Sequence, residues 1–158
     1  MAGNKNTCLR WHLASQRLWR RGALCRKAAK LIQHAGQVLL GCFIGCEADI
    51  EPTVQFVHNG LGVVIHDTAS VGARTIICQQ VTLGVPYPSG GGVPSMNRAP
   101  IIGCDVLVGC GAKLIGPITV CDGARIGANA VVLGDVPAGA TVAGVPAKVV
   151  KRGDALCA

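Results

Sequence analysis

The segment FVHNGLGVVIH, residues 56 to 66, places a histidine beside glycines at Gly60 and Gly62. An unperturbed imidazole titrates near neutral pH, so a histidine can act as a general base. Glycines allow a bound group to approach the backbone closely. We therefore interpret His58 as a candidate general base. From these residues alone, the alternative that His58 is only a polar residue in a turn is the favoured interpretation.

The segment VPYPSGGGVPSMNRAP, residues 85–100, contains four prolines and three consecutive glycines. Such a composition predicts a loop. A loop of this length has a functional role in many proteins and is disordered in many others. The three glycines are not a phosphate-binding P-loop, because no lysine followed by serine or threonine comes after them.

The cysteines give little sign of a metal site. Cys42 and Cys46 are separated by three residues, and no second pair of ligands stands at zinc-finger spacing. No signal peptide and no apolar run of the ~20 residues needed to span a bilayer is evident. We therefore expect a cytoplasmic protein with reduced thiols and no metal.

From residue 44 onward the chain repeats every six residues. A large aliphatic residue takes the first place of each hexad, a small or β-branched residue takes the fifth, and glycine often takes the second. The first places are Ile44, Ile50, Ile65, Val71, Ile77, Leu83, Ile102, Val108, Leu114, Val120, Ile126 and Val132. Between Phe56 and Ile65 the register slips, so the residues around His58 are expected to bulge from the wall.

This period fits neither an α-helix nor an alternating strand. It is typical of a parallel β-helix, in which short strands are joined by turns and each large aliphatic residue points inward. Glycine and asparagine are expected to supply the turn conformations that a β-carbon disfavours. A β-sandwich is the alternative.

The net charge of +7 is unevenly distributed, because residues 1 to 34 contain many arginines and lysines and no acid. The remainder is nearly neutral, which argues against nucleic-acid binding by the domain itself. Residues 9–34 have apolar side chains at helical spacing with basic residues between them. This predicted helix either packs on the β-helix or a partner subunit, or lies on an anionic membrane surface. We favour packing.

Three stretches carry a family resemblance: QQVTLG at 79–84, IGCDVLVGCGAKLIGPITV at 102–120, and IGANAVVLGDVPAGATVAGVPAKVV at 126–150. With the histidine–glycine segment, they resemble the left-handed β-helix acyltransferases. Within these they look most like serine acetyltransferases and their shorter relatives in bacterial surface-polysaccharide pathways. The resemblance implies an all-β solenoid, a homotrimer with a site at each interface, and acetyl-CoA as co-substrate.

The same resemblance implies roles for individual residues. It makes His58 the catalytic base. By position, Val85, Cys110 and Ala128 would contact the pantetheine arm of acetyl-CoA, and Lys148 would meet its nucleotide phosphates. Tyr87, Asn97 and Arg98 in the loop would contact the acceptor.

Two departures from the family pattern stand out. Val57 precedes His58, where serine acetyltransferases have an aspartate that orients the imidazole. Ala99 stands in the loop where they have a second histidine. His66 is interpreted as a surface or groove residue, and assistance to His58 is the alternative.

We expect three parts: a basic helical segment at 1–40, a left-handed β-helix acyltransferase domain at 41–150 with the protruding loop 85–100, and a tail at 151–158. Three functions remain open: acetylation of serine, acetylation of a sugar or surface polysaccharide, and a non-catalytic CoA-binding scaffold. The protein is expected in the cytoplasm, with contact to the inner face of the membrane through residues 9–34 as a further option.

Overall fold

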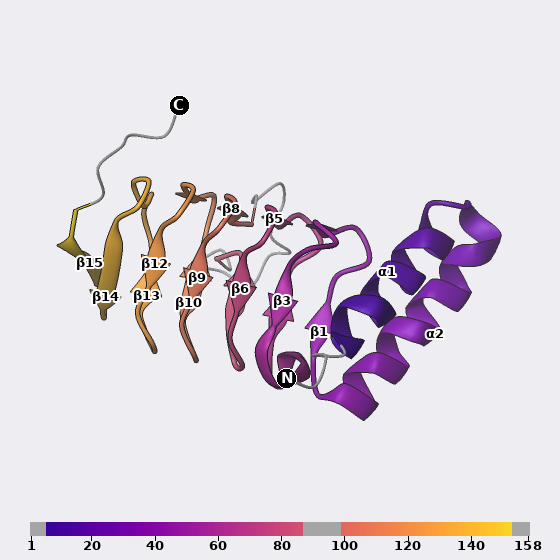
Figure 1. The fold of residues 1–158 in the computed structure, drawn as a ribbon. Helices are drawn as coiled ribbons and strands as arrows, with labels where there is room; N and C mark the ends of the chain where they lie inside the picture. Colours follow the sequence, from indigo (N-terminus) through magenta and orange to yellow (C-terminus); the bar gives the residue numbers. More distant parts are fainter. Residues whose placement is uncertain (1–5, 87–98, 153–158) are drawn as a thin grey trace.

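The computed structural model describes residues 6–86 and 99–152. Two helices stand at one end of a stack of short strands, and the last two strands stand at the other end (Figure 1). The helices are α1 (Thr7–Trp19) and α2 (Ala23–Leu40). The segment 9–34 is thus helical as predicted, but it is divided between two helices instead of forming one. The chain turns between the two helices at Gly22, whose φ of 110° is a conformation that a side chain disfavours.

In the part of the chain that the structure describes, fifteen strands follow the helices. They are β1 (Phe43–Ile44), β2 (Asp49–Ile50), β3 (Gln55–Phe56), β4 (Val64–Ile65), β5 (Ser70–Val71), β6 (Ile76–Ile77), β7 (Thr82–Gly84), β8 (Ile101–Ile102), β9 (Leu107–Val108), β10 (Lys113–Ile115), β11 (Thr119–Val120), β12 (Arg125–Ile126), β13 (Val131–Val132), β14 (Thr141–Gly144) and β15 (Ala147–Lys151). A short 3₁₀ helix, η1 (Val57–Gly60), lies between β3 and β4.

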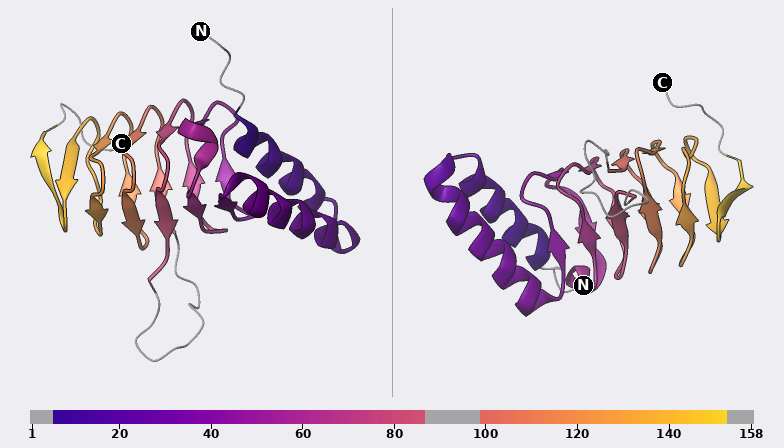
Figure 2. Two further views of the ribbon diagram at one scale, coloured as in Figure 1. Left: turned by 90° about the horizontal axis from the view of Figure 1, so that it is seen from below. Right: turned by 180° about the vertical axis from the view of Figure 1, so that it is seen from behind.

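The strands form three sheets, which the chain visits in turn. The first sheet has the order β1-β4-β7-β10-β13, the second β2-β5-β8-β11, and the third β3-β6-β9-β12-β14-β15. All neighbours pair in parallel except β14 and β15, which are antiparallel. Seen from two further sides, the strands of successive turns of the chain lie side by side (Figure 2).

Three sets of turns join the sheets. The His58 corner leads from the third sheet to the first. The loop corner leads from the first sheet to the second, and residues 85–100 connect β7 to β8 there. The rear corner leads from the second sheet to the third.

The core lies between the three sheets, as the hexads predict. Its largest fully buried side chains are Phe56, Ile65, Ile77, Leu83, Ile102 and Leu114. All but Phe56, which precedes the register slip, stand in the first places listed above, and the small fifth-place residues are buried beside them. Close packing of one aliphatic residue per hexad explains why the repeat is so regular.

The second-place glycines have a different role from the one expected. Gly45, Gly72 and Gly109 do not have positive φ angles. A β-carbon on Gly109 would instead lie 2.7 Å from the backbone nitrogen of Ala128 in the next coil. Glycine is required there because successive coils approach too closely for a side chain. The expected turn conformations occur elsewhere, for example at Asn129 with φ 55°.

The helices cover the open end of the coil and satisfy its backbone carbonyls. The side-chain amide of Gln16 donates to the Ala48 carbonyl at 2.9 Å, and that of Gln33 donates to the Ile44 carbonyl at 2.8 Å. These bonds support packing on the coil, the interpretation we favoured for the basic segment. Neither helix is long and apolar enough to cross a membrane, as far as the described residues show.

Candidate active site

His58 lies in η1, which fills the extra residues between β3 and β4 at the His58 corner. His58 and Asn59 both have left-handed backbone angles, with φ of 51° and 55°. Backbone bonds close the turn: Leu61 N–H donates to the His58 carbonyl at 3.3 Å, and Val63 N–H donates to the Gly60 carbonyl at 2.8 Å. Left-handed geometry at two successive non-glycine residues is costly, and such strain gathers at functional sites.

The imidazole of His58 projects from this turn toward solvent. The side chain is exposed, and no residue of 6–86 or 99–152 forms a hydrogen bond with it. The neighbouring Val57 has no polar side-chain atom that could orient the ring. Among the described residues, therefore, none orients the imidazole of this candidate base.

Two of the residues assigned to the cofactor lie on the same corner as His58. Backbone bonds stack successive turns there: Gln80 N–H donates to the Leu61 carbonyl at 2.8 Å, and Asn129 N–H donates to the Cys110 carbonyl at 2.8 Å. Cys110 and Ala128 thus occupy adjacent coils in the row that begins with the His58 turn. An extended molecule could follow this row along the backbone.

The other assigned residues lie elsewhere. Val85 follows β7 at the loop corner, away from the row of Cys110 and Ala128. Lys148 lies in β15 and faces Ala143 across the antiparallel pair at the end of the third sheet. Tyr87, Asn97 and Arg98 lie outside the described residues.

At the loop corner the structure brings together residues to which the sequence drew little attention. The backbone N–H of Thr68 donates to Nδ1 of His66 at 3.2 Å, and Oγ1 of Thr68 lies 3.0 Å from the same nitrogen. Oγ1 of Thr68 also accepts a bond from the N–H of Ala99 at 3.0 Å. The sequence could have indicated the contact between His66 and Thr68, because the two residues are two positions apart in a turn. It could not have indicated the bond from Ala99, which depends on the tertiary structure.

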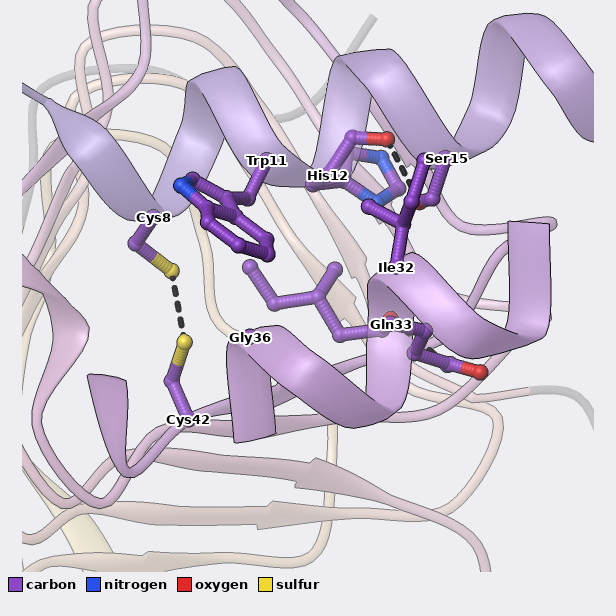
Figure 3. Close-up of a pocket in the computed structure, with 9 residues that line it drawn as sticks. Cys8, Trp11, His12, Ser15, Ile32, Gln33, Gly36 and Cys42 are labelled. Atoms are coloured by element: carbon purple, nitrogen blue, oxygen red, sulfur yellow. Dashed lines mark hydrogen bonds between the residues drawn. The ribbon is translucent and has the colours of Figure 1, made fainter. Parts of the chain in front are cut away.

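A separate cavity of about 20 Å³ lies between the helices and the first coil (Figure 3). Its lining includes Cys8, His12 and Cys42 and none of the residues assigned to the site. Burial lowers the pKa of His12 to about 4, and the nearby Ala48 carbonyl offsets this only in part. Neither ring nitrogen of His12 has a hydrogen-bond partner in the part of the chain described.

The two thiols in this cavity are in contact, with their sulfur atoms 3.0 Å apart. Their hydrogen bond raises the pKa of Cys8 and lowers that of Cys42, and either sulfur can be the donor. Seven described cysteines are free thiols, whereas Cys121 is disulfide-bonded, so the expectation of reduced thiols is wrong at Cys121. Over the described ranges, no three histidine, cysteine or acidic side chains are grouped so as to hold a metal ion.

Comparisons with known proteins agree with this fold. Residues 99–134 match the family model for the bacterial transferase hexapeptide (six repeats). The chain is 42% identical over 139 residues to a serine acetyltransferase of Mycobacterium tuberculosis, covering 88% of this chain and 57% of that protein. It is 41% identical over 122 residues to the serine acetyltransferase of Bacillus subtilis, covering 77% of this chain and 54% of that protein.

Solved structures give the same result. A serine acetyltransferase of Brucella abortus in complex with coenzyme A superposes with a TM-score of 0.82 at 30% identity, covering 93% of this chain and 56% of that one. Soybean serine acetyltransferase complexed with serine gives a TM-score of 0.83 at 34% identity, covering 93% of this chain and 58% of that one. The chain spans about half the length of the curated relatives it matches.

Proposed function

Because this chain resembles the hexapeptide-repeat acyltransferases of the serine acetyltransferase type in both sequence and structure, we propose that it is an acetyl-CoA-dependent O-acetyltransferase. The observation that carries the proposal is the exposed imidazole of His58 at the head of the row formed by Cys110 and Ala128. The base and a path for the acetyl donor thus share one corner.

In this reaction His58 removes the proton from an acceptor hydroxyl as its oxygen attacks the thioester carbonyl. The new C–O bond gives a tetrahedral intermediate with a negatively charged oxygen. Its collapse breaks the C–S bond, and the CoA thiolate leaves and takes up the proton held by His58. The products are the O-acetyl ester and CoA. Backbone N–H groups of the His58 turn are candidates for stabilising the oxyanion.

The active unit is a homotrimer of left-handed parallel β-helices with a site at each interface. Support comes from the separation of the assigned residues: His58, Cys110 and Ala128 occupy one corner, whereas Val85 and the base of loop 85–100 occupy another. Packing the His58 corner of one copy against the loop corner of the next would unite them. The segments 1–40, 41–150 and 151–158 are the functional divisions of the chain, with Lys148 near the end of the second.

The acceptor is serine or a sugar hydroxyl. Likeness to a structure complexed with serine favours serine. Val57 and Ala99 favour a different acceptor, because each replaces a polar group of the serine acetyltransferase pattern. A cytoplasmic location suits use of acetyl-CoA, and the basic residues within 9–34 would allow contact with an anionic inner membrane surface.

The decisive experiment compares acetyl-CoA-dependent CoA release by the wild type and by His58→Ala, with L-serine and a panel of sugars as acceptors. CoA is measured by chromatography because the protein's own thiols react with thiol reagents. We expect His58→Ala to lower turnover by roughly 100- to 10,000-fold. His34→Ala is the matched control, since His34 is an exposed histidine on α2.

Acceptor-dependent release that requires His58 would establish the reaction and identify the acceptor class. Retention of most of the activity in His58→Ala would remove His58 from its role as base. Binding of CoA without release in the presence of any acceptor would favour the non-catalytic scaffold.

A further inference from the structure

His66 has a fixed tautomer and a fixed orientation at the loop corner. A backbone N–H can only donate, so the bond from Thr68 N–H at 3.2 Å requires Nδ1 of His66 to be the acceptor. In the neutral imidazole the proton must then reside on Nε2. The ring therefore presents an N–H donor on the side away from Thr68, and the side chain is half-buried.

The residue His66 is connected to both ends of the loop 85–100, through its backbone at one end and its ring at the other. The backbone N–H of His66 donates to the carbonyl of Leu83, just before the loop, at 2.9 Å. On the far side of the loop, the N–H of Ala99 donates to Thr68 Oγ1 at 3.0 Å, and this hydroxyl lies 3.0 Å from Nδ1 of His66. Hydrogen bonds thus hold His66 in place between the two ends of the loop.

We propose that His66 binds the acetyl acceptor by donating its Nε2–H to an acceptor oxygen, in the site that His58 of a neighbouring copy completes. The proposal rests on the proposed function. Ala99 offers only a buried methyl group, 1% exposed, where the serine acetyltransferase pattern has a histidine. The contacts through Thr68 place another imidazole at the same corner, from the turn between β4 and β5.

The competing explanation is that His66 only caps the N–H of Thr68 and stabilises the turn. The two explanations differ in what a substitution changes. A donor to the acceptor alters the KM for the acceptor, whereas a turn cap alters stability and affects both substrates alike.

The test compares His66→Ala, His66→Gln and the exposed control His34→Ala, using the acceptor that the wild type acetylates best. We expect His66→Ala to lower kcat/KM for the acceptor by about 10- to 100-fold, mainly through KM, with the KM for acetyl-CoA unchanged. His66→Gln restores much of this loss, because its amide places an N–H donor near the position of Nε2. Equal kinetics of wild type and His66→Ala would overturn the proposal.

A mixing experiment tests whether two copies share the site. His58→Ala and His66→Ala chains are unfolded together in equal amounts and refolded, so that mixed trimers form. If a site uses His58 from one copy and His66 from the next, about one quarter of the sites regain both histidines. Activity at low acceptor concentration then rises well above that of either variant refolded alone.

If the activity of the mixed trimers does not rise in this way, the shared site is contradicted. A wild type without acetyl transfer to any acceptor in the panel would be a different outcome, because it rejects the proposed function and the inference together. A wild type that depends on His58 but not on His66 rejects only the inference.

Discussion

Cys8 of α1 packs directly against Gly60 of the turn that carries His58. A β-carbon on Gly60 would lie 3.0 Å from Sγ of Cys8 and 3.5 Å from the ring of Phe56. The N-terminal helix is therefore a support for the candidate active site as well as a cover for the end of the coil. This contact joins the basic segment to the turn that carries His58.

Gly60→Ala should therefore disturb both stability and activity. Gly60 has φ 72°, and a side chain in this region costs about 1–2 kcal/mol before any crowding by Cys8 is counted. We expect a loss of about 2 kcal/mol in the free energy of unfolding and a fall in acetyl transfer. The control is Gly123→Ala at the rear corner, with φ 68° and no atom closer than 3.8 Å. An equal loss of activity in both variants would show that the Cys8 contact has no role in placing His58.

The close approach of coils at Gly109 predicts a larger loss. A methyl group there would lie 2.7 Å from both the Ala128 nitrogen and the Ile126 carbonyl oxygen, which are backbone atoms and cannot rotate away. Gly109→Ala should lower the free energy of unfolding by about 3 kcal/mol, measured by urea denaturation. A β-carbon on Gly134 would meet nothing within 4 Å, so Gly134→Ala should change the free energy of unfolding by less than about 0.5 kcal/mol. Similar midpoints for the two variants would contradict the steric explanation of the second-place glycines.

Removing the amide of Gln16 should uncouple the helices from the coil. Gln16 is 8% exposed, and its amide satisfies the carbonyl of Ala48. Gln16→Ala leaves this carbonyl unpaired in a buried place, which should cost about 1–3 kcal/mol of unfolding free energy. Gln37→Ala on the exposed face of α2 is the matched variant, with little expected change. Thermal unfolding of both decides the point: a Tm for Gln16→Ala equal to that of Gln37→Ala would mean that water replaces the amide.

Acidification should lower the free energy of unfolding because of His12. Its pKa is about 4 in the folded chain, below the ordinary value of 6.5, because burial disfavours the charged ring. As pH falls below 6.5 the unfolded chain takes up a proton that the folded chain refuses, so stability falls until the pH reaches about 4. Between pH 7 and 5 this amounts to about 2 kcal/mol.

His12→Leu removes this titration and the unpartnered ring nitrogens, so its urea midpoint should fall less between pH 7 and 5 than that of the wild type. The exposed His34→Leu serves as the comparison and should follow the wild type. Parallel pH curves for the wild type and His12→Leu would show that another group dominates the acid response.

The hexad pattern was sufficient to predict the core. An inward side chain recurs once per short strand, so residues such as Ile65 and Leu83 could be placed from period alone. The pattern also located the interruption at His58, because a register slip must be accommodated by a turn outside the wall. It did not separate the two N-terminal helices, since apolar spacing continues across Gly22 and only its backbone angle breaks the helix.

The arrangement of the site was decided by tertiary structure. Thr68 and Ala99 are 31 residues apart and meet because β5 and β8 are neighbours in one sheet, a pairing that no local signal specifies. The coil also decides which residues lie at different corners. Val85 lies at the loop corner, whereas Cys110 and Ala128 lie at the His58 corner. The sequence by itself determined the repeat, the buried face and the candidate base, because these depend on side-chain type and period. Only the stacking of coils decided which polar groups share a corner, since hydrogen bonds between coils join residues by position in space.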